Sequence, residues 1–271
     1  MHHEQSSYGD GQSPRERHVP RVREPRLTMR SSRALIAGVA ALAVAIPLVV
    51  RSGHPDTTDG TKAALPVAET VSGQFADFGS HVPSADARYV ADWIADSRDN
   101  MATDFIMVDK KTATVYVFDK QARLRGASPV LLGAAVGDDT VPGIGDKPLN
   151  QVLPEERTTP AGRFLAERGR NAEGVDVVWV DYDAAVSMHR VKTTNPIERR
   201  LERLASTTVD DNRISWGCVN VPVAFYESTI RPMFATQRAV VYVLPDTKSV
   251  QQVFGAYDVA SRNRVAAHVK P

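Results

Sequence analysis

The stretch DFIMVDKKTATVYVFDKQARLRGASPVLLGAAVG, residues 104–137, decides the fold class. It holds three runs rich in β-branched and aromatic residues, FIMVD, TATVYVFD and SPVLLGAAVG, separated by the polar sequences KK and KQARLRG. Short runs of this kind, bounded by polar turns, are typical of β-strands. The stretch therefore predicts a β-hairpin followed by a third strand.

The segment from residue 101 to 247 continues in the same way, with helices inserted late. Further strands are predicted at 175–183, 184–191, 213–215 and 239–245, and helices at 196–206 and 222–234. We expect a mainly β domain of the α+β class, a sandwich or small barrel with antiparallel or mixed sheets. The Gly/Pro-rich passage 137–162 predicts a long loop, and such loops are usually functional or mobile.

An apolar segment at 34–50, ALIAGVAALAVAIPLVV, follows a basic flank and holds 17 residues without a charge. This pattern predicts a secretory signal or a signal anchor, and hence export to the cell envelope, in the periplasm or on the outer face of the inner membrane. A buried core helix is the alternative, because 17 residues is short for a membrane span. The sequence leaves cleavage open, and both Met1 and Met29 are candidate starts.

The predicted organisation has five parts. They are a polar Arg-rich tail (1–33), the signal or anchor (34–50), a linker with an amphipathic helix near 84–97 (51–100), the β-rich domain (101–247) and a weakly structured or helical C-terminal extension (248–271). The tail has seven Arg against four acidic residues, a net charge of +3, whereas residues 51–271 have 26 basic and 28 acidic residues, a net charge of −2. A folded part without basic excess argues against nucleic-acid binding.

Cys218, in the stretch RISWGCVNVP (213–222), is the only cysteine of the chain. Cysteines of exported proteins usually pair, so a lone one is either an inert buried thiol or a nucleophile. A nearby imidazole or helix N-terminus would lower the thiol pKa, and a helix is predicted to begin near Pro222. Backbone N–H groups in the turn Trp216–Gly217–Cys218 are candidate donors to a developing oxyanion.

His189 is the candidate base. Of the seven histidines, it alone falls within the β-rich domain, on or just after the strand predicted at 184–191. A histidine that serves only packing is the alternative. One cysteine and one histidine in the domain, without metal-ligand spacing, predict no metal site.

Together these residues resemble the catalytic domain of the L,D-transpeptidase family (YkuD-type). That family has a histidine, a variable stretch and then S-H-G-C-x-R or S-H-G-C-x-N, which is similar to His189 followed by SWGCVN (215–220). TTPAGRF (158–164) resembles the family's T-P-x-G-x-F segment, and the opening hairpin also resembles the family's. The matches come in the family's order and cover residues 103–245.

The resemblance implies an exported cell-wall enzyme with a β-rich domain and no metal or organic cofactor. Its cysteine would attack the peptide bond after the third residue of a peptidoglycan stem tetrapeptide, release D-alanine and pass the acyl group to an amine. That amine would belong to another stem peptide or to an anchored envelope protein. Carbapenem-type β-lactams, which acylate this family, are the expected inhibitors.

The resemblance also implies roles for individual residues. Cys218 would be the nucleophile and His189 the base, with the backbone of Gly217, Cys218 and Trp216 as the oxyanion hole. The supporting or substrate-binding residues would be Ser215, which shapes the turn, Asn220, Arg190, whose backbone carbonyl orients the imidazole, Arg213 and Tyr182.

Two departures from the family pattern stand out. Trp216 replaces the family's second histidine, which changes rate or acceptor choice if that imidazole contributes charge. His189 and Cys218 are 29 positions apart (218 − 189), more than is common in the family, and the excess fits the charged segment 195–206. We predict a helical flap beside the cleft there; a solvated surface insertion is the alternative.

Other interpretations remain open at this stage. One open question is whether the pocket is lined by Trp179, Tyr182 and Met188. The alternative is that these side chains only pack in the core. The same scaffold would also suit a hydrolase of stem peptides or of protein–peptidoglycan links. A third interpretation is a non-catalytic peptidoglycan-binding module of the envelope.

Overall fold

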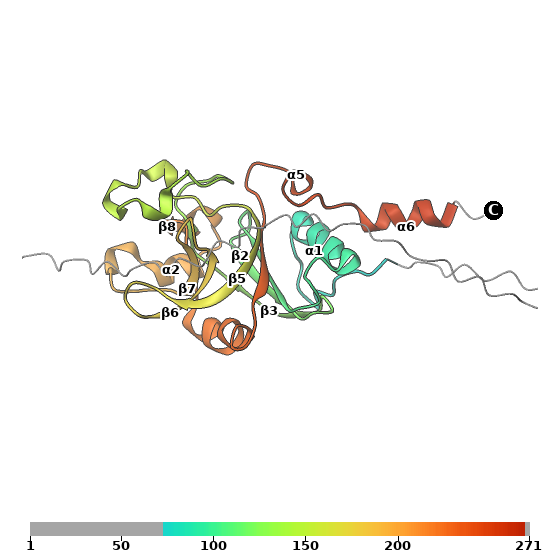
Figure 1. The fold of residues 1–271 in the computed structure, drawn as a ribbon, viewed down its shortest axis with the longest axis horizontal. Helices are drawn as coiled ribbons and strands as arrows, with labels where there is room; N and C mark the ends of the chain where they lie inside the picture. Colours follow the sequence, from blue (N-terminus) through green and yellow to red (C-terminus); the bar gives the residue numbers. More distant parts are fainter. Residues whose placement is uncertain (1–72, 269–271) are drawn as a thin grey trace, which may run out of the picture. The chain divides into compact units, whose positions relative to one another are not determined.

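The computed structural model describes residues 73–268. The tail, the apolar segment 34–50 and most of the linker lie outside these residues. No helix within 73–268 is long and apolar enough to span a membrane. The described part opens with α1 (Ala85–Ser97) and closes with α5 (Val250–Phe254) and α6 (Val259–His268) (Figure 1).

One large mixed sheet holds eight strands of the described chain, in the order β3-β2-β1-β10-β5-β6-β7-β9. Their bounds are β1 Phe105–Asp109, β2 Thr114–Phe118, β3 Leu124–Pro129, β5 Gly162–Arg170, β6 Asp176–Asp181, β7 Val186–Arg190, β9 Val219–Val221 and β10 Ala239–Val243. The pairs β1–β10 and β7–β9 are parallel and the others antiparallel. Two short strands, β4 (Leu132–Gly133) and β8 (Arg213–Ser215), form a separate parallel pair.

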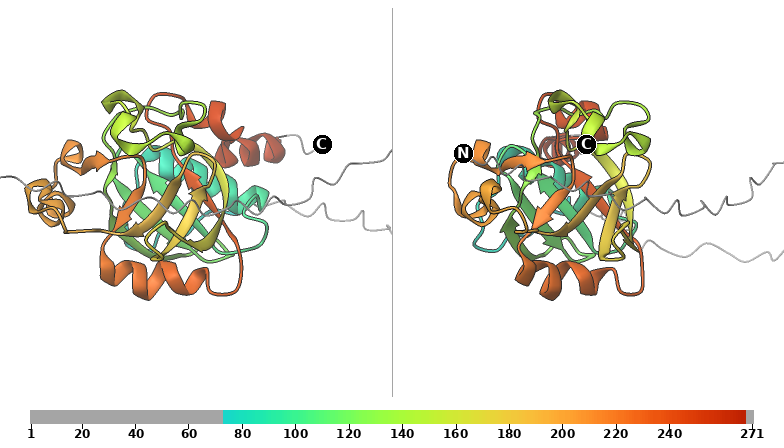
Figure 2. Two further views of the ribbon diagram at one scale, coloured as in Figure 1. Left: turned by 60° about the vertical axis from the view of Figure 1, so that its left-hand side comes forward. Right: turned by 90° about the vertical axis from the view of Figure 1, so that its left-hand side faces the viewer.

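The large sheet curls until its two edges meet. Just beyond β3, Leu131 pairs with Asn220 on β9 through two backbone hydrogen bonds of 2.9 and 2.8 Å. This contact makes the sheet a nearly closed barrel, as Figure 2 shows from two sides. The predicted mainly β, mixed-sheet, barrel-like class is confirmed.

Strand β1 is buried on both faces, and its alternating side chains serve two cores. Ile106 and Val108 point into the barrel, where they pack with Val241 of β10. Phe105 and Met107 point outward and pack with α1, which buries Val90, Ala91, Trp93 and Ile94. The Ser84 hydroxyl caps α1 by accepting from the Ala87 N–H at 3.1 Å and also donates to Asp109 at 2.6 Å, tying the helix to the end of β1.

Several predicted elements differ from those observed. The third strand starts at Leu124, inside the stretch predicted as a turn, with a register shift between Val117 and Phe118. The nine-residue β5 and the three-residue β9 were not predicted. The sequence of β5, GRFLAERGR, leaves most of its side chains exposed or half-buried, so it lacks the apolar run by which the other strands were found.

The two predicted helices are also less regular than expected. The segment at 196–206 is a 3₁₀ turn, Pro196–Glu198, followed by α2 (Arg200–Ala205), with Arg199 at φ +46° between them. The segment at 222–234 is α3 (Val223–Phe225), a π-helical stretch (Tyr226–Ile230) and α4 (Arg231–Met233). This run covers one end of the barrel, where Tyr226, Ile230 and Phe234 complete the inner core (Figure 2).

A buried charge cluster joins three distant parts of the chain. Lys110, fully buried after β1, lies 3.0 Å from Asp138 and 3.2 Å from Asp246 and donates to the Thr159 carbonyl at 2.9 Å. Asp138 also accepts from the backbone N–H groups of residues 246–248. Burial raises the pKa of Asp138, but these donors and Lys110 outweigh it and hold that pKa well below its usual range. The carboxylate is therefore charged in the folded protein.

Asp138→Asn should lower the free energy of unfolding at pH 7 by about 3 kcal/mol, because it leaves Lys110 short of a charged partner in the interior. The folded pKa lies below the unfolded value of about 3.9, so the stabilisation is complete above about pH 4 and is lost as the pH falls. Denaturant unfolding at several pH values measures this difference.

Asp139→Asn is the matched control, because the Asp139 side chain is 74% exposed and pairs with an exposed lysine. It should change stability by less than about 0.5 kcal/mol. A destabilisation by Asp138→Asn that stays constant from pH 7 to pH 3 would contradict the role given to its charge.

Candidate active site

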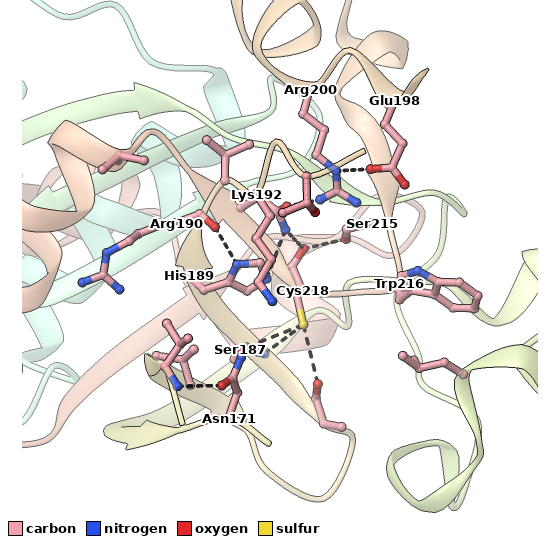
Figure 3. A pocket seen from close by; sticks show the side chains of 18 of the residues that line it. Asn171, Ser187, His189, Arg190, Lys192, Glu198, Arg200, Ser215, Trp216 and Cys218 are labelled. Atoms are coloured by element: carbon pink, nitrogen blue, oxygen red, sulfur yellow. Dashed lines mark hydrogen bonds and ion pairs between the residues drawn. The ribbon is translucent and has the colours of Figure 1, made fainter. Parts of the chain in front are cut away.

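The parallel pairing of β7 with β9 places Cys218 beside His189. In the register of these strands, Met188 lies opposite Val219 and His189 opposite Asn220. Cys218, one residue before β9, is therefore level with Ser187. Because alternate side chains of a strand share a face, Ser187 and His189 lie on the face that looks away from the core residue Met188 (Figure 3).

The Cys218 thiol is partly exposed and sits among polar groups. Its Sγ lies 3.5 Å from the Ser187 backbone nitrogen, which donates to it, 3.6 Å from the Ser187 hydroxyl and 3.6 Å from the Ala185 carbonyl oxygen (Figure 3). Burial raises the pKa of Cys218, but the interactions with His189 and Ser187 outweigh it and bring that pKa below its ordinary value. These contacts favour the thiolate, the reactive form of cysteine.

The imidazole of His189 is oriented by the backbone. Its Nδ1 lies 2.7 Å from the Arg190 carbonyl oxygen, which only accepts hydrogen bonds, so Nδ1 carries the proton. In the neutral ring Nε2 then carries the lone pair and accepts from the Asn220 side-chain nitrogen at 3.5 Å. The Arg190 side chain points away from His189 in Figure 3, toward Glu227 at 2.5 Å, so Arg190 reaches the ring through its backbone alone.

The turn before β9 is held by Ser215 and requires a glycine. The Ser215 hydroxyl donates to the Cys218 carbonyl at 2.6 Å and accepts from the Gly217 N–H at 3.1 Å. Gly217 has φ +126°, and a Cβ there would lie 2.7 Å from the Thr158 carbonyl oxygen. Of the three predicted oxyanion-hole donors, Gly217 therefore already has an acceptor. Within residues 73–268, the N–H groups of Trp216 and Cys218 have none.

Thr159, which sequence analysis did not select as a site residue, anchors this turn from behind. Its buried hydroxyl donates to the Gly217 carbonyl at 2.8 Å and accepts from the Gly133 N–H at 2.8 Å. Its own carbonyl accepts from Lys110 in the charge cluster. The sequence signal for Thr159 was the TTPAGRF segment. The second threonine of this segment links the turn before Cys218 to β4.

The Trp216 ring is turned away from His189 (Figure 3). It is 39% exposed, and the Arg157 guanidinium lies 3.7 Å from its centroid in a cation–π contact. The side chain therefore does not stand in for an imidazole next to the thiol. Any role for Trp216 at Cys218 falls to its backbone.

A cleft of about 560 Å³ opens over the thiol. Its walls include Ser187, His189, Asn220 and Trp216, together with Trp179 of β6. The segment 195–206 forms part of the wall, because Glu198 and Arg200 both line the cleft and Arg200 donates to the Asn220 side-chain oxygen. The predicted flap thus lies beside the cleft, and its movement remains a prediction.

Three expectations about the site are wrong. Arg213 does not line the cleft; it is nearly buried and donates to Asp246 at 2.7 Å and to the Lys110 carbonyl at 3.1 Å. Tyr182 is 66% exposed in the turn after β6, where it packs edge-on against Trp179 rather than entering the cleft. The helix after Pro222 does not start at the thiol, because β9 intervenes, so His189 and Ser187 lower the thiol pKa instead.

The described residues hold no cluster of three or more His, Cys, Asp or Glu side chains suited to a metal ion. The residues around Cys218 provide a thiol with a lowered pKa, an oriented imidazole and, within residues 73–268, two backbone N–H groups without an acceptor. That set can perform acyl transfer through a covalent thioester.

No protein-family model matches the chain, and no curated protein sequence does. Some solved structures are similar to parts of this chain. The NMR structure of the catalytic domain from E. faecium L,D-transpeptidase is 16% identical, with a TM-score of 0.30, over 53% of this chain and 98% of that one. The helical cell shape determining protein Pgp2 from Campylobacter jejuni is 11% identical, with a TM-score of 0.37, over 65% and 58%. This chain spans half of a longer crystal structure of the E. faecium enzyme.

The rate of Cys218 alkylation by iodoacetamide should follow the thiolate fraction, with a midpoint below the value of about 8.5 for a free cysteine. In His189→Gln the midpoint should move upward, because the imidazole no longer favours the thiolate. The single cysteine makes the mass change unambiguous. An identical midpoint in both proteins would show that His189 does not interact with the thiol.

Thr159→Val should reduce the free energy of unfolding by about 1–3 kcal/mol, because it leaves the buried Gly133 N–H and Gly217 carbonyl without their common partner. Thr159→Ser keeps the hydroxyl and is the control. Thermal unfolding and alkylation kinetics together would show whether the turn has moved. Equal behaviour of the two variants would rule out the anchoring role.

Proposed function

We propose that this protein is a cysteine acyltransferase of the cell envelope, an L,D-transpeptidase that acts on peptidoglycan stem peptides. The observation that carries the proposal is the Cys218 thiol, whose pKa is lowered, open to a cleft and next to a His189 ring oriented by the Arg190 carbonyl. The motifs TTPAGRF and SWGCVN support the choice of family. Export through the segment 34–50 would bring the domain to its substrate.

The proposed first half-reaction acylates the enzyme. His189 accepts the Cys218 proton at Nε2, and Sγ attacks the carbonyl carbon of the peptide bond after the third stem residue. In this step the N–H groups of Trp216 and Cys218, which have no acceptor within residues 73–268, stabilise the oxyanion. The carbon–nitrogen bond then breaks, and D-alanine leaves as an amine that takes its proton from His189.

The second half-reaction returns the enzyme to its starting state. An acceptor amine attacks the thioester, gives a proton to His189 and forms a new amide, and the thiolate is released and reprotonated. The acceptor is an amine of another stem peptide or of an anchored envelope protein. If water takes its place, the same enzyme is a hydrolase.

Cys218→Ala should abolish formation of the thioester and of every product on muropeptides, with the fold retained, as mass spectrometry and circular dichroism would show. His189→Gln should lower kcat by about 10²–10⁴-fold, the usual contribution of a general base. Full activity of Cys218→Ala would refute the assignment.

The alternatives separate in the same assay. Products formed with and without an added amine acceptor distinguish transfer from hydrolysis. A mass adduct of a carbapenem on Cys218 is expected for the acyltransferase, whereas a protein that binds muropeptides but forms neither adduct nor product is a binding module.

A further inference from the structure

The segment 195–206 brings one guanidinium to the reacting groups. The side chain of Arg200 is only 11% exposed and lines the cleft. Its Nη1 donates to the Asn220 side-chain oxygen, and its Nε donates to Glu198 at 2.5 Å. The other atom of the Asn220 amide, Nδ2, lies 3.5 Å from His189 Nε2 and 3.4 Å from the Cys218 carbonyl oxygen. Arg200 is therefore one side chain away from the base.

The backbone of the segment presents this guanidinium in a fixed place. Arg199 at φ +46° turns the chain between the 3₁₀ turn and α2, and the side chains of Glu198 and Arg200 meet across that turn. The buried Leu204 fastens α2 to Leu131 and Val191 of the barrel. A guanidinium held in this way loses little freedom when it binds a ligand.

Arg200 has a hydrogen-bond donor that is not used within the described residues. Its Nη2 has no partner within the described residues 73–268, although the side chain faces the cleft. The guanidinium fork matches the two oxygens of a carboxylate, and the contact with Glu198 shows that a carboxylate is accepted here. The neighbouring cation Lys192 is paired with Glu173 at 2.5 Å, and the Arg190 side chain points away from His189 (Figure 3).

The leaving group must lie on the same side of the thiol as Arg200. His189 has to hand a proton to the departing amine, so that amine lies next to Nε2, where Asn220 and then Arg200 follow. The departing amine is the α-nitrogen of an amino acid, whose own carboxylate lies two bonds further from the scissile bond.

We propose that Arg200 is a specificity-determining residue that binds the C-terminal carboxylate of the acyl donor, and that this carboxylate displaces Glu198, which occupies the guanidinium in the free enzyme. The ligand class is a peptide with a free carboxylate on the residue after the scissile bond. The identity of the reaction rests on the proposed function, but the binding does not require turnover.

Two stem tetrapeptides that differ only at the C-terminus, one a free acid and the other an amide, test this inference. Their binding is measured by protection of Cys218 from iodoacetamide, with each variant's rate without peptide as its own reference; kcat and KM for both are measured separately. The acid should bind wild type about tenfold or more tightly than the amide, since one charge-assisted contact is lost in the amide. The preference should shrink with added salt.

Arg200→Gln should remove the preference for the acid, and Arg200→Lys should keep part of it, because a lysine has the charge without the fork. Glu198→Gln should strengthen binding of the acid by removing its competitor. Arg199→Gln is the control. It removes the same charge from the neighbouring residue, whose side chain is 66% exposed and pairs with Glu202. It should keep the full preference.

The outcomes separate this inference from the proposed function. Turnover with equal binding of acid and amide, or a preference that survives in Arg200→Gln, would overturn the role of Arg200 and leave the acyltransferase standing. Protection by the acid that depends on Arg200, without turnover of either peptide, would support the carboxylate site and refute the acyltransferase. A lack of protection by both peptides would overturn the inference.

Discussion

The rest of the site depends on the parallel pairing of β7 with β9. Two strands separated by the whole segment from 191 to 218 run side by side, and their register sets Cys218 level with Ser187 and Asn220 opposite His189. The same strand β9 also closes the barrel against Leu131. The edge where the sheet closes is therefore also the place where the Cys218 thiol and the His189 imidazole meet.

A second layer of contacts holds the cysteine turn to this edge. Gly217 provides the positive φ that the turn needs. The Ser215 hydroxyl donates to the Cys218 carbonyl within the turn, and the Thr159 hydroxyl donates to the Gly217 carbonyl and so links the turn to β4. The Thr159 carbonyl in turn accepts a hydrogen bond from Lys110 of the buried charge cluster. Removing one partner of a buried ion pair is strongly destabilising, so the cluster resists a displacement of Lys110 away from its carboxylates. A chain of hydrogen bonds thus links Lys110, through Thr159, to the turn that holds Cys218.

The site combines a generic part and a part specific to this chain. The imidazole and the Arg190 carbonyl come from β7, the thiol comes from the residue before β9, and in the proposed function these three groups serve acyl transfer. Arg200, Glu198 and the stacked pair of Trp216 and Arg157 come from loops and from the inserted segment. Arg200, Glu198 and Trp216 line the cleft. In the proposed function they are the groups that would select peptides and acceptors, because loops vary more freely than the scaffold that carries them.

The sequence by itself determined the class of the fold and the candidate pair, Cys218 and His189, on which the proposed function rests. Runs such as FIMVD and AVVYVLP are apolar and buried on both faces, so local pattern suffices to find them. One cysteine with one histidine in the domain leaves a single candidate pair. Only the tertiary structure decided what lies around that pair. The half-exposed β5 and the short β9 have no distinctive local pattern, and the burial of Arg213 with Asp246 and the reach of Arg200 to Asn220 depend on contacts between distant segments. Register and long-range pairing follow from how the whole barrel closes, which no local stretch of sequence contains.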